Sequence, residues 1–304
     1  MPGDLSQPVS SALGSAPGSA PGSAPWSAPG AAPRIVVYTC SLGGYDWVNA
    51  PLAATPDTAF IRISDQPPRS PGTWQHRPIS MLDHFGIEGG PRLLARFAKL
   101  YAHRLFPEAE LSIWIDGNIK ILTDLTPLID RFRTTGAAAA FFPHPSGRTA
   151  LEEMVAALGW GRIGSAHFDR AARQVARYAE AGALDDRVHE TSIVFRRHDA
   201  REIGAFADLW WDELTAFTER DQVSLPFVLQ RSGLTVHDWD FHFADLVNPY
   251  FRRVPHRPKS LLKRVRKGIR YQADADRTYK LLSRVADPIE RGLRLVGIRF
   301  QEPM

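Results

Sequence analysis

The chain has 304 residues, of which 44% are hydrophobic and 23% are charged, a composition ordinary for a globular protein with a sizeable core. Its formal net charge of +4 favours anionic partners such as phosphates and nucleotides but does not indicate a nucleic-acid-binding protein. Cys40 is the single cysteine, which excludes an intramolecular disulfide and a cysteine-based zinc site. No apolar run approaches the roughly 18 residues that span a bilayer, and no signal-peptide pattern opens the chain, so we expect a soluble cytoplasmic protein.

The N-terminal tail and the start of the fold differ sharply in composition. Residues 1–33 predict a disordered tail, because a Ser-Ala-Pro repeat with Gly leaves almost nothing to bury. We expect the folded domain to cover 34–250. An apolar, β-branched segment over 34–40 predicts a buried strand that ends at a Gly-Gly loop. A second strand is predicted over 59–64, and a helix over 91–105 gathers its apolar residues on one face.

Strands and helices alternate through the middle of the chain. The apolar segment 111–116 predicts a third strand, and 118–122 a further extended stretch. The later elements are predicted in order as a helix capped at Thr126-Pro127, a strand over 137–142, helices over 149–159 and 166–182, a strand over 191–197 and a helix over 200–217. This alternation predicts an α/β fold with a mixed, mostly parallel sheet, and we expect the antiparallel strands at its edge.

The C-terminal segment 251–304 is predicted to be a basic helical extension. It is rich in Lys and Arg over 252–270, a stretch that contains no acidic residue. Leu261, Val265 and Ile269 recur every four residues, which predicts a basic amphipathic helix. Such a helix can dock at an anionic membrane surface or pack its apolar stripe on the body of the protein, and the sequence leaves both interpretations open.

Asp116 is the first candidate for chemistry, because it ends an apolar strand and precedes Gly117. Ligands of open α/β sheets bind beyond the carboxyl ends of the strands, and a carboxylate there can hold a ribose hydroxyl or a divalent cation such as Mg²⁺ or Mn²⁺. Asp-Gly between two extended segments is also a typical hairpin turn. The two interpretations can hold together.

The predicted helix over 91–105 carries a basic stripe formed by Arg92, Arg96, Lys99 and His103. A diphosphate needs charge neutralisation and hydrogen-bond donors, which such a stripe supplies. A solvated helix face is the alternative, and it is the more frequent arrangement for a stripe considered alone.

Two further carboxylates lie near predicted element starts. Asp221 can act as a base or stabilise a cationic sugar centre. Alternatively it can be the N-cap or a first-turn acid of the helix that follows, stabilised by the helix dipole, and the local pattern favours the cap. Glu190 precedes the strand 191–197 and can bind an acceptor hydroxyl or pair with an arginine. The segment 237–242 concentrates His and Asp, and in an extended strand His237 lies on the face opposite its neighbours. Metal binding and a polar edge strand are the two interpretations of that segment.

Taken in order, these segments resemble a known family. It is the glycosyltransferase-like domain found in bacterial polysaccharide loci and in plant turgor-regulation and seed-mucilage proteins. The matching pieces are Tyr38-Thr-Cys-Ser-Leu-Gly-Gly-Tyr-Asp46, Ser64-Asp65, Ala95-Arg96-x-x-Lys99-x-x-x-His103-x-x-Phe106-Pro107, Ile113-Trp-Ile-Asp-Gly117, 144–153, 190–197 and Arg220-Asp-Gln222. They cover most of 34–250, and their order is more specific than any single piece.

The resemblance implies a GT-A fold, a nucleotide-binding α/β sandwich with the acceptor half downstream. It also implies transfer of a sugar from a nucleoside-diphosphate sugar to a glycan or lipid-linked acceptor. In such enzymes the ends of the first two strands hold the base, which assigns Tyr38, Thr39 and Asp65 to base binding. The protein is then expected in the cytoplasm, peripherally at the inner membrane face, with no nucleic-acid partner.

The resemblance further implies roles for the charged candidates. Arg96 and Lys99 would approach the diphosphate, and Asp116 would occupy the metal and ribose motif. Asp221 would lie near the reacting sugar, with Glu190 as a second catalytic candidate.

One position departs from the family's pattern. GT-A enzymes commonly carry Asp-x-Asp, whereas this chain has Asp116-Gly-Asn118, and a neutral amide oxygen is a weaker ligand for Mn²⁺ or Mg²⁺. The predicted metal ligands are Asp116, Asn118 and His237. Two other classes stay open: a non-catalytic module that binds sugar nucleotides or polysaccharide, and a lipid amidase, as some plant relatives have been described. No nucleophile or zinc cluster in the sequence supports the amidase.

Overall fold

A computed structural model describes residues 34–68, 72–243 and 248–256. The predicted tail over 1–33 lies outside the described residues. So does the predicted amphipathic helix with Leu261, Val265 and Ile269. The start of the predicted C-terminal extension, 251–256, is described and packs on the body of the protein through a short strand.

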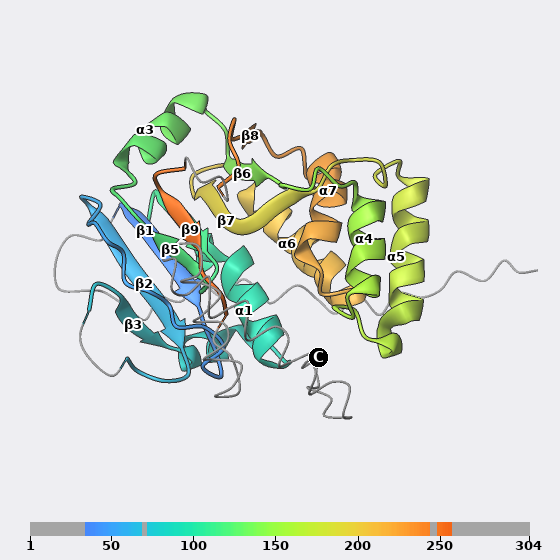
Figure 1. The fold of residues 1–304 in the computed structure, drawn as a ribbon, viewed down its shortest axis with the longest axis horizontal. Coiled ribbons are helices and arrows are strands. Elements are labelled where there is room, and N and C mark those ends of the chain that lie inside the picture. The colour runs from blue at the N-terminus through green and yellow to red at the C-terminus, as the bar shows by residue number, and fades with distance from the viewer. Residues whose placement is uncertain (1–33, 69–71, 244–247, 257–304) are drawn as a thin grey trace, which may run out of the picture.

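The main sheet places one reversed strand at its centre (Figure 1). In spatial order the described strands are β3 (Gln75–Pro78), β2 (Thr58–Ser64), β1 (Ile35–Cys40), β4 (Leu111–Ile115), β7 (His189–Arg197), β6 (Ala139–Pro143) and β8 (Val236–Asp238). β7 pairs antiparallel with β4 and β6, and the other described pairs are parallel. The predicted α/β fold with a mixed, mostly parallel sheet is confirmed.

The expectation that antiparallel strands lie at the sheet edge is wrong. β7 is buried on both faces through its middle residues, Ile193, Val194 and Phe195. A strand with apolar side chains on both faces gains most from a central position, where helices or strands cover each face.

Helices cover one face of the sheet, and a helix with a two-stranded sheet covers the other. The described helices are α1 (Pro91–Leu100), α2 (Ala102–Leu105), α3 (Thr126–Thr135), α4 (Ala150–Gly159), α5 (Phe168–Glu180), α6 (Ile203–Ala216) and α7 (Asp221–Ser232), with 3₁₀ turns η1 (Ile79–Phe85) and η2 (Ser165–His167). The two-stranded sheet consists of β5 (Ile119–Ile121) and β9 (Phe251–Arg253).

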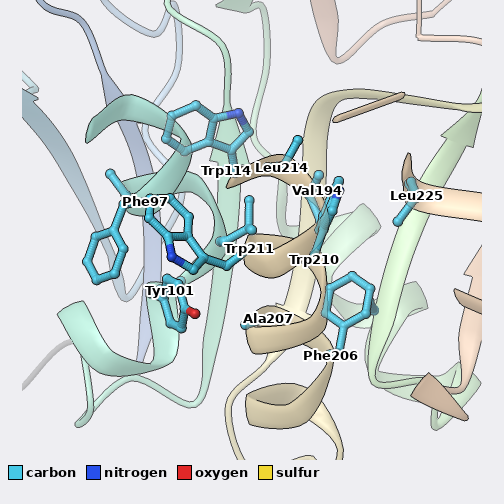
Figure 2. Close-up of a cluster of buried hydrophobic side chains, with 14 of the residues drawn as sticks. Phe97, Tyr101, Trp114, Val194, Phe206, Ala207, Trp210, Trp211, Leu214 and Leu225 are labelled. Atoms are coloured by element: carbon cyan, nitrogen blue, oxygen red, sulfur yellow. The ribbon is translucent and has the colours of Figure 1, made fainter. Parts of the chain in front are cut away.

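The two faces follow from the period-2 alternation of the strands. In β1, Val36 and Tyr38 belong to the core under α1 and α6, whereas Ile35 and Val37 belong to the core on the α3 side. Figure 2 shows the first core, where aromatic side chains from α1 and α6 meet. Phe97 lies edge-on to Trp211 there, with ring centroids 5.4 Å apart.

Three local predictions need correction. The helix predicted over 91–105 breaks at Tyr101, whose backbone leaves the helical region with φ −103° and ψ 38°. The N-cap of the helix that begins at Thr126 is Leu125, one residue before the predicted cap. The Asp124 carboxylate accepts from both the backbone N–H and the hydroxyl of Thr126. Asp116-Gly117 does form a turn, because Ile119 N–H donates to the Asp116 carbonyl at 2.9 Å. It is no hairpin, however, since β4 and β5 belong to different sheets.

Candidate functional site

A cavity of about 1470 Å³ opens at the carboxyl ends of β1 and β4. The loop after β1 contributes Ser41, and the turn after β4 contributes Asp116. Because β7 runs the opposite way, its first residues, including Glu190, reach the same edge of the sheet. The start of α7 adds Asp221. The cavity therefore lies where ligands bind in open α/β sheets.

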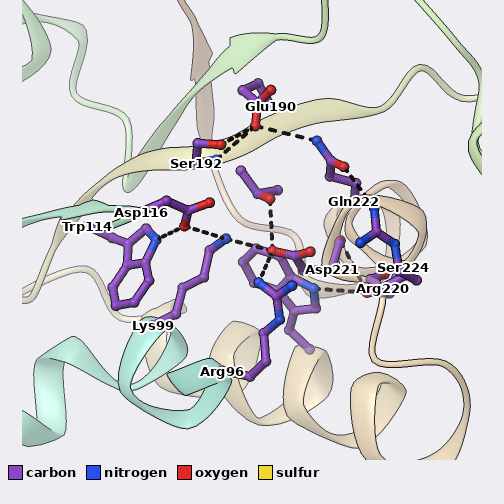
Figure 3. Close-up of polar contacts among 12 residues, drawn as sticks. Arg96, Lys99, Trp114, Asp116, Glu190, Ser192, Arg220, Asp221, Gln222 and Ser224 are labelled. Carbon is purple, nitrogen blue, oxygen red and sulfur yellow. Dashed lines mark hydrogen bonds and ion pairs between the residues drawn. The ribbon is translucent and has the colours of Figure 1, made fainter. Parts of the chain in front are cut away.

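Asp221 is the acceptor at the centre of a buried ion cluster (Figure 3). Its Oδ2 accepts from Arg96 Nη1 at 2.6 Å, from Lys99 Nζ at 2.6 Å and from Thr191 Oγ1 at 2.8 Å. Burial alone would raise the pKa of this carboxyl, but Arg96 and Lys99 outweigh burial and hold the pKa far below its usual range. Asp221 is thus a fixed negative charge.

Lys99 links this cluster to Asp116. The lysine side chain is 1% exposed, and its Nζ lies 3.9 Å from Asp116 Oδ1. That same oxygen accepts from Trp114 Nε1 at 2.8 Å, while the Asp116 backbone N–H donates to the Ser192 carbonyl. Burial raises the pKa of the Asp116 carboxyl, and the charges of Lys99 and Arg96 oppose that rise. The Asp116 side chain keeps 35% of its surface exposed, so it is available to a ligand.

These contacts decide between the earlier alternatives. Arg96 lines the cavity and Lys99 is buried against Asp221, so a wholly solvated helix face is wrong for these two residues. Arg92 is exposed and also lines the cavity. Asp221 is not the N-cap, which is Arg220, but it does lie in the first turn of α7 as an acidic residue there. Its side chain accepts from side-chain donors and caps no backbone N–H of the described residues.

Glu190 pairs with an arginine, which was one of its two interpretations. Its Oε2 accepts from Arg253 Nη2 at 2.7 Å, and its Oε1 accepts from the hydroxyl and the backbone N–H of Ser192. Burial would raise the pKa of Glu190, but Arg253 and Ser192 lower it below the usual range. Glu190 lines the cavity as a second fixed carboxylate.

The turn after β4 is held by residues that local motifs did not assign. Gly117 lies so close to Asp46 that an added Cβ would meet the Asp46 carboxylate at 2.8 Å. Asp46 Oδ1 is 2.7 Å from His256 Nδ1, and His256 Nε2 is 3.5 Å from Asn118 Nδ2. Asn118 is buried, and its Oδ1 has no hydrogen-bond partner. Position 117 therefore requires glycine because Asp46 packs against its Cα, and not because of its backbone angles.

The opposite wall of the cavity is cationic and aromatic. Glu153 is buried between Arg148 at 3.0 Å and Arg220 at 3.3 Å. Trp160, directly after α4, is 53% exposed and lines the cavity. The guanidinium groups of Arg148 and Arg162 lie 4.6 and 4.5 Å from its ring centroid. The loop over 144–153 was expected to match the family, but Trp160 and Arg162 had no motif to mark them.

The residues assigned to base binding do not lie on the cavity wall. Tyr38 is fully buried, and its hydroxyl accepts from Arg196 and contacts the carbonyl oxygens of Ala98 and Lys99. Thr39 is also fully buried. Asp65 is exposed and accepts from Gly43 N–H at 3.0 Å, so it orders the loop after β1. The assignment of Tyr38 and Thr39 is corrected, because the cavity begins only at Cys40.

His237 is not near the predicted metal site. It lies on β8, and β6 and β7 separate that strand from β4 and Asp116. Its ring packs edge-on against Trp239, with centroids 4.9 Å apart. Within the described ranges, no group of three or more His, Cys, Asp or Glu side chains could hold a metal ion. The prediction of Asp116, Asn118 and His237 as one ligand set is therefore wrong, although the first two share the cavity.

No helix in the described part of the chain is long and apolar enough to cross a membrane.

Comparison with known proteins gives one family match. The model of the "TOD1/MUCI70, glycosyltransferase-like domain" matches residues 88–248, more than half of the 304-residue chain. Alkaline ceramidase TOD1 of Arabidopsis thaliana is 29% identical over 167 residues, which are 52% of this chain and 35% of the relative. The probable hexosyltransferase MUCI70 of the same plant is 31% identical over 140 residues, 43% of this chain and 23% of the relative. The chain thus spans about a third or less of these two plant relatives.

Solved structures show a more distant likeness. The apo form of mouse xyloside xylosyltransferase 1 matches with a TM-score of 0.43 and 10% identity, covering 68% of this chain and 84% of that chain. The Mn/GDP form of core-mannan synthase A from Aspergillus fumigatus matches with a TM-score of 0.41 and 11% identity, covering 76% and 77%.

Proposed function

The chain belongs to the TOD1/MUCI70 glycosyltransferase-like domain family, and we propose that it transfers a sugar from a nucleoside-diphosphate sugar to a glycan or lipid-linked acceptor. The observation that carries this proposal is the cluster of Arg96, Lys99, Asp116 and Asp221 at the carboxyl ends of β1 and β4. It combines buried cations with an accessible carboxylate at the edge of the sheet where nucleotides bind.

The size of the cavity supports two ligands. Its volume of about 1470 Å³ exceeds the roughly 300–1,000 Å³ of a pocket for one small molecule. The Asp116 end would hold the donor, and the wall with Trp160 and Arg162 would hold the acceptor. In the reaction the acceptor hydroxyl oxygen bonds to the anomeric carbon, the bond from that carbon to the diphosphate breaks, and the hydroxyl proton is released.

The cations would act on the leaving group. Negative charge grows on the diphosphate as the sugar departs, and preorganised donors in an enclosed site stabilise such charge strongly. Arg96 and Lys99 are held in place by Asp221, so they need little reorganisation at that moment. We therefore propose Asp221 as a positioning residue. Its lowered pKa and its three donors make it a poor proton acceptor.

Two oxygen groups fit a divalent cation in this cavity. The accessible Asp116 carboxylate and the unpartnered Asn118 Oδ1 are the hard ligands that Mg²⁺ and Mn²⁺ prefer. When bound, such a cation would neutralise charge on the diphosphate. Because Asn118 supplies no negative charge and Lys99 lies beside Asp116, we propose that the protein's own cations carry part of that role.

Three finer points belong to the same proposal. The parallel β1, β2, β3 and β4 would form the nucleotide-binding half of a GT-A fold, with the acceptor half around α4 and α7. A cytoplasmic location, peripherally at the inner membrane face, would suit a lipid-linked acceptor. The segment 251–304 would supply the contact with an anionic membrane, since it is rich in Lys and Arg.

A panel of nucleotide sugars tests the proposed function. Purified full-length protein should hydrolyse at least one donor slowly without acceptor, detected as release of nucleoside diphosphate. Saturable binding of a nucleotide sugar without any hydrolysis or transfer would indicate a binding module instead. Release of fatty acid from ceramide, independent of any nucleotide sugar, would indicate the activity named for the TOD1 relative.

A further inference from the structure

An apolar groove runs between α4 and α5 beside the candidate acceptor wall. Its volume is about 600 Å³, and its lining is formed by Met154, Leu158, Phe168, Ala171, Ala172, Val175 and Ala176. None of these side chains is charged. Phe168 is 51% exposed at one end of the groove, and Val155 and Leu151 are exposed on α4. The groove and these exposed side chains together form a small apolar surface on α4 and α5.

The groove adjoins the main cavity at the end of α4. Leu158 lines the groove, and Trp160, two residues later, lines the cavity. Phe168 begins α5 shortly after the same connection. The cavity and the groove therefore both border the connection between α4 and α5, although they share no lining residue.

Exposed arginines lie in and after the connection between α4 and α5. Arg162 is exposed, lines the cavity and makes no ion pair with a carboxylate of the described residues. Arg148 is already paired with Glu153. Arg170 and Arg173 are exposed on α5. An exposed, unpaired guanidinium beside an aromatic ring is suited to a phosphate group.

We propose that this surface binds the acceptor as a lipid phosphate. The phosphate lies at Arg162 beside Trp160, and the apolar chain lies along the groove between α4 and α5. This inference rests on the proposed function and narrows its acceptor to the lipid-linked class. The lining on α5 runs from Phe168 to Ala176, about 12 Å of helix, which accommodates most of a dodecyl chain.

Other occupants fit the surface less well. A second copy of the chain in a two-fold dimer would apply the same surface from both sides, which brings the exposed Arg162, Arg170 and Arg173 of both copies into one interface, and like charges repel. A glycan chain would find no polar side chain in the groove to satisfy its hydroxyl groups.

The test uses the full chain and three probes below their micelle-forming concentrations. Dodecyl phosphate, dodecyl maltoside and inorganic phosphate are titrated by calorimetry. We expect dodecyl phosphate to bind about tenfold or more tightly than either of the others, because it uses both the groove and the guanidinium. Equal affinity for inorganic phosphate would overturn the role of the groove, and equal affinity for the maltoside would overturn the role of Arg162.

Matched variants separate the groove from the rest of α5. Ala172→Glu places a charge in the groove and should weaken dodecyl phosphate binding about tenfold, because the charge must be desolvated. Ala179→Glu makes the same change at an exposed position of α5 outside the groove and should leave the affinity unchanged. Arg162→Gln should weaken dodecyl phosphate but not dodecyl maltoside, whereas Arg201→Gln, also exposed, should affect neither.

Three outcomes would identify a different answer. Equal affinities of Ala172→Glu and Ala179→Glu would overturn the inference. Loss of self-association in Ala172→Glu by sedimentation would assign the groove to a second copy. Tighter probe binding in Leu261→Glu would assign it to the segment 257–304 of the same chain.

Donor hydrolysis keeps this inference distinct from the proposed function. Ala172→Glu should hydrolyse the donor as the wild type does. Dodecyl phosphate binding without any donor hydrolysis contradicts the proposed function, whereas hydrolysis without binding contradicts the inference.

Discussion

Asp221 and Glu110 each bridge two cationic side chains, at different edges of the fold. Asp221 joins Arg96 and Lys99, both at 2.6 Å, with 4% of its side chain exposed. Glu110, directly before β4, joins Arg34 at 2.5 Å and Arg133 at 2.8 Å with 33% exposed. The contact distances are alike, but burial differs. Desolvated charges interact strongly and cannot be left unpaired, whereas solvent screens exposed charges.

The location of each cluster gives this difference its meaning. Asp221 lies at the edge of the sheet where the cavity opens, and Glu110 lies at the opposite end of β4. A fold gains little from burying an ion cluster where apolar packing would serve. A buried ion cluster beside the accessible carboxylate of Asp116 therefore points to a functional site.

The largest effect is expected from Asp221→Asn. It leaves Arg96 and Lys99 without their shared buried partner, and removing one member of such a cluster costs about 3–5 kcal/mol. Lys99→Met should cost less, because Asp221 keeps Arg96 and Thr191. Urea unfolding at pH 7 measures both. A smaller loss in Asp221→Asn than in Lys99→Met would break the assignment of Asp221 as the centre of the cluster.

The same variant has a predicted pH dependence. Because the folded pKa of Asp221 lies below its unfolded value of about 3.9, its stabilising contribution is fully present above that value. The contribution is lost as pH falls toward the folded pKa. The difference in unfolding free energy between wild type and Asp221→Asn should therefore shrink below about pH 4. A difference that stays constant down to pH 2 would contradict the lowered pKa.

Asp116→Asn tests the function of the second carboxylate near Lys99. The substitution preserves size and removes the charge that faces the cavity, so donor turnover should fall about 10²–10³-fold. Folding should be nearly unchanged. Asp240→Asn is the control, since it removes an exposed carboxylate paired with Arg131 outside the cavity. Turnover is compared with and without Mn²⁺, and comparable activity of the variant would remove Asp116 from the proposed donor site.

Gly117→Ala should have an intermediate effect. Its Cβ would lie 2.8 Å from the Asp46 carboxylate, so Asp46 must move away from His256. Such overpacking costs about 1–3 kcal/mol, and donor turnover should fall with it. Gly204→Ala is the control, and it should stabilise the protein. Its Cβ meets open space on α6, and alanine stabilises a helix by about 0.5–1 kcal/mol relative to glycine. Melting temperatures that shift in the same direction for both variants would contradict the close packing of Asp46 against Gly117.

Local sequence predicted the parts of the site that one element determines. Spacing placed Arg96 and Lys99 on one helix face and Asp116 at the end of an apolar strand. Only the resemblance to the family assigned the two cations to the diphosphate. The strand–helix alternation likewise predicted the sheet. The central position of β7 was not predictable in this way, because it depends on which distant strands pair with it.

The errors came from contacts that sequence proximity does not encode. Tyr38 lies two residues before the cavity begins, and strand alternation turns its ring into the core. His237 was grouped with Asp116 by residue type, although two strands separate them. His256 meets Asp46 across 210 residues, a contact that no motif signals. Burial then changed an expected cap, Asp221, into the centre of an ion cluster.

The smallest effect is expected from Glu110→Gln, and it completes the comparison with Asp221. Glu110 also bridges two cations, and its pKa lies below the usual range because Arg133 and Arg34 outweigh the effect of burial. Its partners are exposed, so the loss in unfolding free energy should be about 0–1 kcal/mol. Raising the salt concentration should diminish that loss further, since exposed pairs are screened, but should leave the cost of Asp221→Asn nearly unchanged. Urea unfolding of both variants at low and high salt provides the measurement. Equal costs, or an equal response to salt, would mean that burial does not distinguish the two clusters, and the functional argument built on the Asp221 cluster would lose its basis.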